Sequence, residues 1–115
     1  MNNQIPDLLE SDVTVYLPVF ERSVTLSRAA NYTAYSPLYD SNNRQDLTLV
    51  EPGDPISRAL RLTQGGRLNR FCLTFRISSG SSTLVEQEGW GDTPQEAAHK
   101  LSSRLQTIRN IIRWG

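Results

Sequence analysis

The stretch ALRLTQGGRLNRFCLTFRIS, residues 59–78, contains two runs of alternating apolar side chains on either side of a Gly-Gly pair. The second run is the clearer one, because every second residue is large and apolar: Phe71, Leu73, Phe75 and Ile77. Alternation with a period of two is typical of an antiparallel strand that buries one face, and two glycines permit the positive φ angles of a tight turn. We therefore predict a β-hairpin with one apolar face.

The hydrophobic period changes near the C-terminus. Thr93 precedes Pro94 and stands three residues before Glu96, a pattern typical of a capping box with proline at the first helical position. Apolar residues then recur at intervals of four, three and four, at Leu101, Leu105, Ile108 and Ile112. A stripe with this spacing predicts an amphipathic helix, and we expect it to cover the apolar face of the hairpin.

The chain of 115 residues is long enough for one domain with one core. Short alternating stretches precede the hairpin, and turn-forming residues separate them. The predicted fold class is α+β: an antiparallel meander sheet with an N-terminal hairpin and a C-terminal amphipathic helix packed on one face. The expected segments are an arm over 1–12, the N-terminal hairpin over 13–29, the sheet over 31–90 and the helix over 93–114.

The apolar surface of this arrangement suggests a second copy. A single helix over a sheet leaves apolar area uncovered in a chain of this length, and dimerisation would cover it. We therefore expect an interlocked homodimer. The four apolar strand residues and the four stripe residues named above are assigned to the core and to this dimer interface.

The charge of the chain is balanced overall but not locally. Twelve basic and twelve acidic residues give a net charge of zero, yet five arginines and no acidic residue lie between Pro55 and Val85. Arginine is preferred where forked donors meet phosphates or carboxylates. We predict that the side of the hairpin opposite the helix binds RNA, through Arg58, Arg61, Thr63, Arg67, Thr74 and Arg76.

The alternative for these residues is an ordinary solvated strand face, on which arginine stems cover apolar area. A solvated face usually mixes the two signs of charge. The absence of acidic residues from this stretch therefore favours RNA as the partner.

Nothing in the sequence indicates catalysis, a metal or a cofactor. His99 lies among polar positions of the predicted helix, and Cys72 lies in mid-strand without an identifiable partner, so a solvated histidine and a packed thiol are expected. The carboxylates form no spaced pair for acid–base chemistry, and one cysteine offers no zinc ligand set. Trp90 and Trp114 are expected to pack at the two ends of the helix. We predict a protein that is not an enzyme.

The order strand, Gly-Gly turn, strand, loop, strand and capped helix resembles the coat proteins of the small single-stranded RNA bacteriophages. ALRLTQGGRLNRFCLTFRIS is similar to that family's two long central strands, and STLVEQEGWGDTPQEAAHKLSSRLQTI is similar to its last strand and following helix. TVYLPVFERSVTLSRA resembles the family's outer hairpin, and DLTLVEP resembles its next short strand. The family usually has two consecutive helices, whereas this chain has room for one of substantial length.

The resemblance implies that two copies join their sheets edge to edge, that each helix crosses onto the partner's sheet, and that dimers assemble into an icosahedral shell. It also implies that the inner sheet face binds genomic RNA, including a hairpin whose binding represses translation of the replicase. The SSGSS loop over 78–82 would then meet neighbouring copies. The protein would reside in a virion assembled in the bacterial cytoplasm, which agrees with a sequence that lacks a signal-peptide pattern and a membrane-spanning stretch.

Two other functions stay open. Residues 71–105 also resemble the second half of a double-stranded-RNA-binding domain, as in a small RNA-binding regulator, although TPQEAAHK stands where that module has a lysine cluster. A phage-encoded inhibitor of a host protein is also compatible with the sequence.

Overall fold

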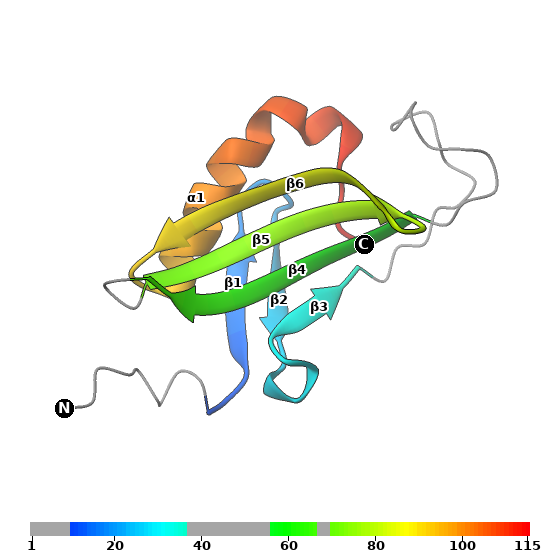
Figure 1. Ribbon diagram of the computed structural model, residues 1–115. Helices are drawn as coiled ribbons and strands as arrows, with labels where there is room; N and C mark the ends of the chain where they lie inside the picture. The colour runs from blue at the N-terminus through cyan, green and yellow to red at the C-terminus, as the bar shows by residue number, and fades with distance from the viewer. Residues whose placement is uncertain (1–9, 37–55, 67–69) are drawn as a thin grey trace.

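The computed structural model describes residues 10–36, 56–66 and 70–115, which form an α+β domain with a C-terminal helix (Figure 1). A two-stranded sheet contains β1 (Val13–Leu17) and β2 (Arg22–Leu26). A four-stranded sheet contains, in spatial order, β3 (Thr33–Tyr35), β4 (Ile56–Gly65), β5 (Arg70–Ser79) and β6 (Ser82–Gly91). All strand pairs are antiparallel, so the predicted α+β meander is confirmed. The predicted strand within DLTLVEP lies outside the described residues, as do residues 1–9 of the predicted arm.

The pairing of β4 with β5 follows the alternation in the sequence. Leu60 is opposite Phe75 and Leu62 is opposite Leu73, and these side chains are at most 3% exposed. Phe71 and Ile77 on the same face of β5 are fully buried. The apolar alternation therefore defines one face of the sheet, as expected for strands that are half buried.

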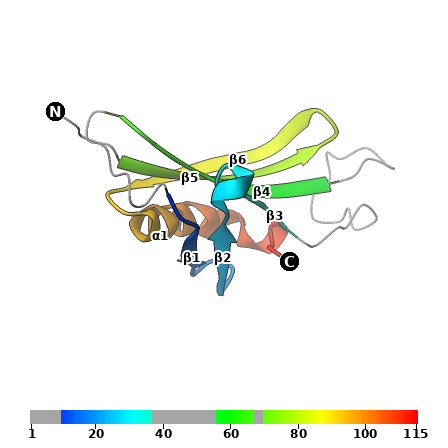
Figure 2. The same ribbon diagram turned by 90° about the horizontal axis from the view of Figure 1, so that it is seen from below.

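The helix α1 (Pro94–Leu105) and the β1–β2 hairpin both lie on this apolar face, and the other face of the sheet is left bare (Figure 2). Two contacts join the helix to the hairpin. The side-chain amide of Gln95 donates to the carbonyl of Tyr16 and accepts from its N–H, both at 2.8 Å. The N–H of Val19 donates to the buried hydroxyl of Ser102 at 3.4 Å. The two elements therefore form one covering layer.

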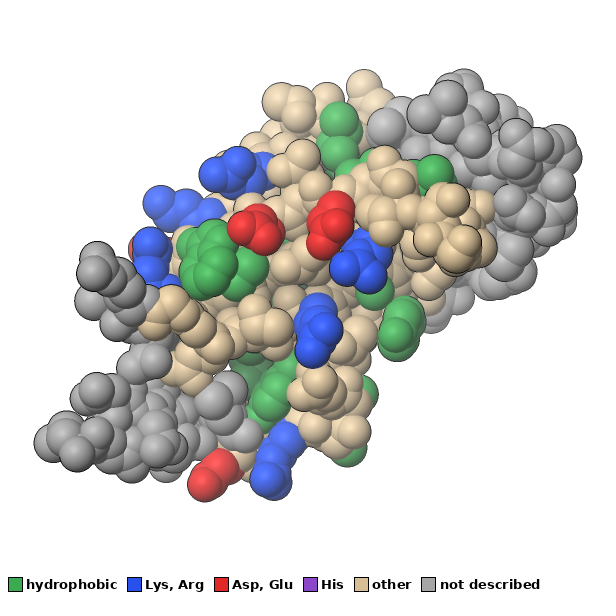
Figure 3. Space-filling model, viewed as in Figure 1, with side chains coloured by type: hydrophobic (Ala, Val, Ile, Leu, Met, Phe, Trp, Pro, Cys, Tyr) green, Lys and Arg blue, Asp and Glu red, His purple; other side chains and the backbone are tan. Residues whose placement is uncertain are grey.

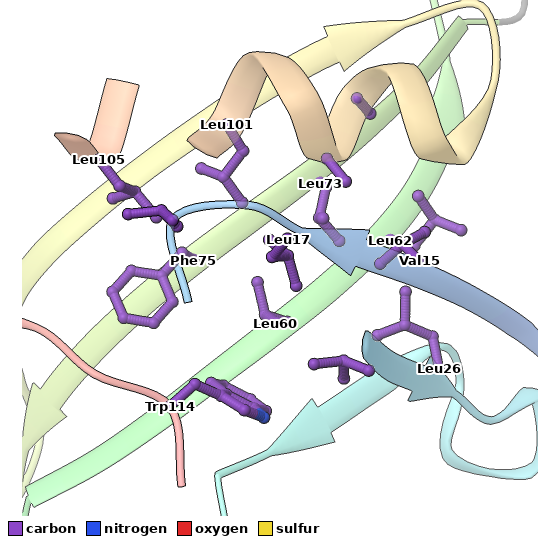
Figure 4. Packing of buried hydrophobic residues seen from close by; sticks show 14 of the residues in the cluster. Val15, Leu17, Leu26, Leu60, Leu62, Leu73, Phe75, Leu101, Leu105 and Trp114 are labelled. Carbon is purple, nitrogen blue, oxygen red and sulfur yellow. The ribbon is translucent and has the colours of Figure 1, made fainter. Parts of the chain in front are cut away.

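Buried side chains from the sheet, the hairpin and the helix meet in a single core (Figure 4). At one end of this core Phe75 lies 5.4 Å from Phe20 and 6.5 Å from Trp114 between ring centroids. The hairpin covers the part of the apolar face that the helix does not reach. The prediction that one copy leaves much of its apolar surface uncovered is therefore wrong for the described residues. The large hydrophobic side chains exposed among them are Tyr16, Tyr35 and Trp90.

The predicted helix over 93–114 is too long. α1 ends at Leu105 and is followed by a 3-10 segment, η3 (Gln106–Ile111), in which Ile108 has the non-helical angles φ −123° and ψ 19°. The chain is extended at Ile112. Several β-branched residues here lower the helix propensity, and the turn brings Trp114 onto the aromatic end of the core. Leu101 and Leu105 are fully buried, Ile112 is 7% exposed, and Ile108 is only partly buried.

The start of α1 is as the sequence predicts. The hydroxyl of Thr93 accepts a hydrogen bond from the N–H of Glu96 at 3.1 Å, and Pro94 occupies the first turn. The Glu96 carboxylate accepts from the N–H of Asp92 at 2.7 Å, one residue before the usual partner in a capping box. These bonds fix the point at which the chain leaves β6 and enters the helix.

The helix lies directly on the backbone of β6 because two glycines there have no side chain. A Cβ atom on Gly89 would lie 2.3 Å from the backbone nitrogen of Leu101 and 2.5 Å from the carbonyl oxygen of Ala97. A Cβ atom on Gly91 would lie 2.6 Å from the nitrogen of Ala97. The two glycines are therefore required by close approach, and Ala97 supplies a small surface on the helix side.

We expect Gly89→Ala to lower the free energy of unfolding by more than about 2 kcal/mol, because α1 must move away from β6 to admit a methyl group. Gly65→Ala is the matched control, since a Cβ atom at Gly65 meets nothing within 4 Å. Urea denaturation of both variants measures the difference. Equal stabilities would contradict the close packing of α1 on β6.

Candidate nucleic-acid interface

The bare side of the four-stranded sheet is called the open face from here on. It is the side opposite α1 and the hairpin, and it carries every second residue of the strands. Its residues are Thr33, Tyr35, Ser57, Ala59, Arg61, Thr63, Arg70, Cys72, Thr74, Arg76, Ser78, Glu86, Glu88 and Trp90.

Four of the six predicted RNA-binding residues lie together on the open face. The register places Arg61 opposite Thr74 and Thr63 opposite Cys72, with Arg76 two residues further along β5. A shallow hollow of about 360 Å³ is lined by Arg61, Thr63, Thr74 and Arg76 with their neighbours. Guanidinium groups can donate two parallel hydrogen bonds to a phosphate, and hydroxyl groups can contact a sugar or a base edge.

Arg58 does not belong to this face, so its assignment to RNA binding is wrong. Along β4 it lies two residues before Leu60 and four before Leu62, so its side chain points to the same face as theirs, toward the core. It is only 1% exposed. Arg67, the sixth predicted residue, lies outside the described residues.

The open face is not free of acidic residues, and this overturns the reason for favouring RNA over a solvated face. The stretch from 56 to 84 contains no acidic residue, but β6 pairs with β5 and brings acids beside it. Glu86 lies opposite Arg76 and forms an ion pair with it at 3.3 Å, and Glu88 lies opposite Thr74. Figure 3 shows basic and acidic side chains close together over the sheet.

The two central arginines are therefore unequal. Arg76 shares its charge with Glu86, and both side chains are about half exposed. Arg61 is exposed, with Thr33 and Thr74 as cross-strand neighbours, and it makes no ion pair with any residue that the structure describes. Arg61 is the stronger candidate for contact with a phosphate.

The open face carries two exposed aromatic residues, Trp90 and Tyr35, and the sequence analysis assigned Trp90 to a different position. Trp90 was expected to pack at the end of the helix, but Gly89 and Gly91 face α1, so the alternation of β6 turns Trp90 to the opposite side. It is 38% exposed, and Tyr35 at the other edge of the sheet is 68% exposed. The Gly-Trp-Gly pattern was the signal that could have indicated this orientation.

Cys72 is a buried free thiol, 4% exposed, although it belongs to the open face. Burial raises the pKa of this thiol above its ordinary value, and the nearby carboxylate of Glu88 raises it further. Hydrogen bonds to Thr74 and Thr63 lower the pKa, but by less. The thiol therefore remains protonated and poorly reactive, as expected for a packed cysteine.

We expect iodoacetamide at pH 8 to alkylate Cys72 several-fold more slowly in the folded protein than in urea, because unfolding returns the thiol to water and lowers its pKa. Raising the pH toward the ordinary thiol pKa and beyond should destabilise the fold, since the folded state favours the protonated form. Mass spectrometry of the alkylated chain gives the rate. Equal rates in the two states would contradict the burial.

Other kinds of site find no support in the described part of the chain. No group of three His, Cys, Asp or Glu side chains there could hold a metal ion, and His99 is exposed on α1. None of the described helices is long and apolar enough to cross a membrane. Comparisons with protein-family models, with curated proteins and with solved structures found no match for this chain.

Proposed function

We propose that this chain is a viral coat protein that dimerises, self-assembles into an icosahedral shell and binds single-stranded genomic RNA on its open face, including a hairpin that represses translation. The observation that carries the proposal is the one-sided fold. Hairpin and helix cover one face of the sheet, while no described element covers the other face and no described strand pairs with the outer edge of β6. A shell protein needs such a division between an outer layer and an inner surface.

The free edge of β6 supports self-association. β6 has ten residues and pairs with β5 alone in the described structure, so its outer edge presents unpaired N–H and C=O groups. An exposed edge of this length is a template for pairing with another chain. Antiparallel pairing of two β6 edges about a two-fold axis perpendicular to the sheet keeps both open faces on the same side.

The driving force for this dimer is backbone pairing rather than leftover apolar area. The strand residues Phe71, Phe75 and Ile77 are already fully buried within one copy. Next to the β6 edge, however, Leu84 and Val85 are only partly buried. Pairing of two edges would bring these side chains from both copies together and bury more of their surface.

RNA is the proposed ligand of the open face because of its donors. Arg61 offers a guanidinium group without a carboxylate partner among the described residues, and threonine hydroxyls surround it. The ion pair of Arg76 with Glu86 is exposed, and exposed pairs contribute little to stability. A phosphate can therefore replace the carboxylate at low cost.

We expect the protein, produced in bacteria, to elute as dimers or larger species and to form closed particles visible by electron microscopy, because the β6 edge is open for pairing. Size-exclusion chromatography over a range of concentrations checks the first step. A stable monomer without particles would contradict the proposal. If such a monomer bound duplex RNA tightly, the small RNA-binding regulator would take its place.

We expect Arg61→Ala to weaken binding of a single-stranded oligouridine by about tenfold, roughly 1.5 kcal/mol. The slope of the logarithm of the binding constant against the logarithm of the salt concentration should become shallower by about one, because one phosphate contact is lost. Arg76→Ala should have a smaller effect because Glu86 already neutralises that side chain. Arg104→Ala, on the exposed side of α1, is the matched control. Fluorescence anisotropy at several salt concentrations measures all three. Equal effects of Arg61→Ala and Arg104→Ala would show that binding does not use the open face.

A further inference from the structure

The indole ring of Trp90 has a fixed position on the open face. Its Nε1–H group donates to the carboxylate of Glu88 at 2.9 Å. A Cβ atom placed on Gly66 would lie 3.9 Å from Cζ3 of the ring. Since Trp90 belongs to β6 and Gly66 follows β4, the ring reaches across the strand between them. It therefore lies over β5.

The burial of Cys72 agrees with this position. Cys72 lies opposite Trp90 on β5 and points to the open face, yet only 4% of it is exposed. One face of the indole thus rests on the sheet, while the residue as a whole remains 38% exposed. A large aromatic surface held in place in this way is a preformed platform that loses little side-chain freedom on binding.

Polar groups suited to a nucleotide surround the platform. On β5, Arg70 and Thr74 flank Cys72, the residue opposite Trp90, and lie on the same face of the sheet as the ring. Such diagonal neighbours are close enough to contact a ligand that lies on the ring. The buried Nε atom of Arg70 lies 3.3 Å from the carboxylate of Asp92, and the two side chains are 39% and 77% exposed. Because the Asp92 side of this pair is open to water, the pair contributes little to stability, and a phosphate can compete with the carboxylate for the guanidinium.

We propose that Trp90 is a stacking site for one unpaired nucleobase of single-stranded RNA, with Arg70 contacting the adjoining phosphate and Thr74 the sugar. This inference rests on the proposed RNA binding of the open face and adds the residues that hold one of the bases. Aromatic side chains bind unpaired bases by stacking, whereas bases in a duplex offer no free face. The guanidinium and hydroxyl groups beside the ring match the phosphate and the sugar that adjoin a stacked base, and this favours RNA over a protein partner.

The test uses a single-stranded oligouridine and a duplex RNA of the same length as probes. We expect Trp90→Leu to weaken binding of the oligouridine by about tenfold or more. Tyr16→Leu is the matched control, because Tyr16 is also an exposed aromatic residue, 44% exposed, but lies on the hairpin away from the open face. Its hydrogen bonds to Gln95 come from the backbone and survive the substitution.

Stacking is read directly from tryptophan fluorescence. In a Trp114→Phe background the emission comes from Trp90 alone, and we expect the oligouridine to quench it and the duplex to leave it unchanged. Trp114 is part of the aromatic end of the core. If its replacement unfolds the protein, the difference between the emission of the original chain and that of Trp90→Leu gives the same signal.

The outcomes separate this inference from the proposed function. Oligouridine binding that is unaffected by Trp90→Leu and causes no quenching would overturn the stacking site and leave RNA binding by phosphate contacts. Equal quenching by the duplex would also overturn it. Failure of the original chain to bind either RNA would overturn the proposed RNA function and this inference together.

Discussion

The contact between the backbone of α1 and the glycines of β6 is the constraint on which the rest of the structure depends. Gly89 and Gly91 leave no room for a side chain beneath the helix, so α1 can approach the edge strand at backbone distance. The cap at Thr93 fixes where the helix begins. Together they place the helix over one face of the sheet, and the hairpin fills the remaining part of the same face through Gln95 and Ser102.

Two surfaces result from this one-sided packing, and the proposed function uses both. The first is the open face, where Arg61, threonine hydroxyls and Trp90 are presented without a covering layer among the described elements. The second is the outer edge of β6, whose backbone groups have no described partner beyond β5. Because the glycines turn Trp90 outward, the same feature that seats the helix also builds the aromatic part of the open face.

The sequence predicted the features that depend on local periodicity, and it missed those that depend on which strands meet. Alternation identified the buried face of β5, and the capping pattern located the start of α1. The alternation that buries Leu60 also predicts a buried Arg58 two residues earlier, and this was overlooked. The acids of β6 were overlooked in the same way, because a meander places the last strand beside the strand of Arg76. Only the register shows that Glu86 is the residue opposite Arg76. The end of α1 likewise depends on an aromatic contact of Trp114 with distant residues.

Hydroxyl-radical footprinting with mass spectrometry tests the one-sided fold most directly, because it measures how accessible each aromatic side chain is to solvent. The account predicts rapid oxidation of Tyr35 and Trp90, and strong protection of Phe71 and Phe75 beneath the hairpin and helix. Rapid oxidation of Phe71 and Phe75 together with protection of Trp90 would mean that the helix covers the other face, and would contradict the account.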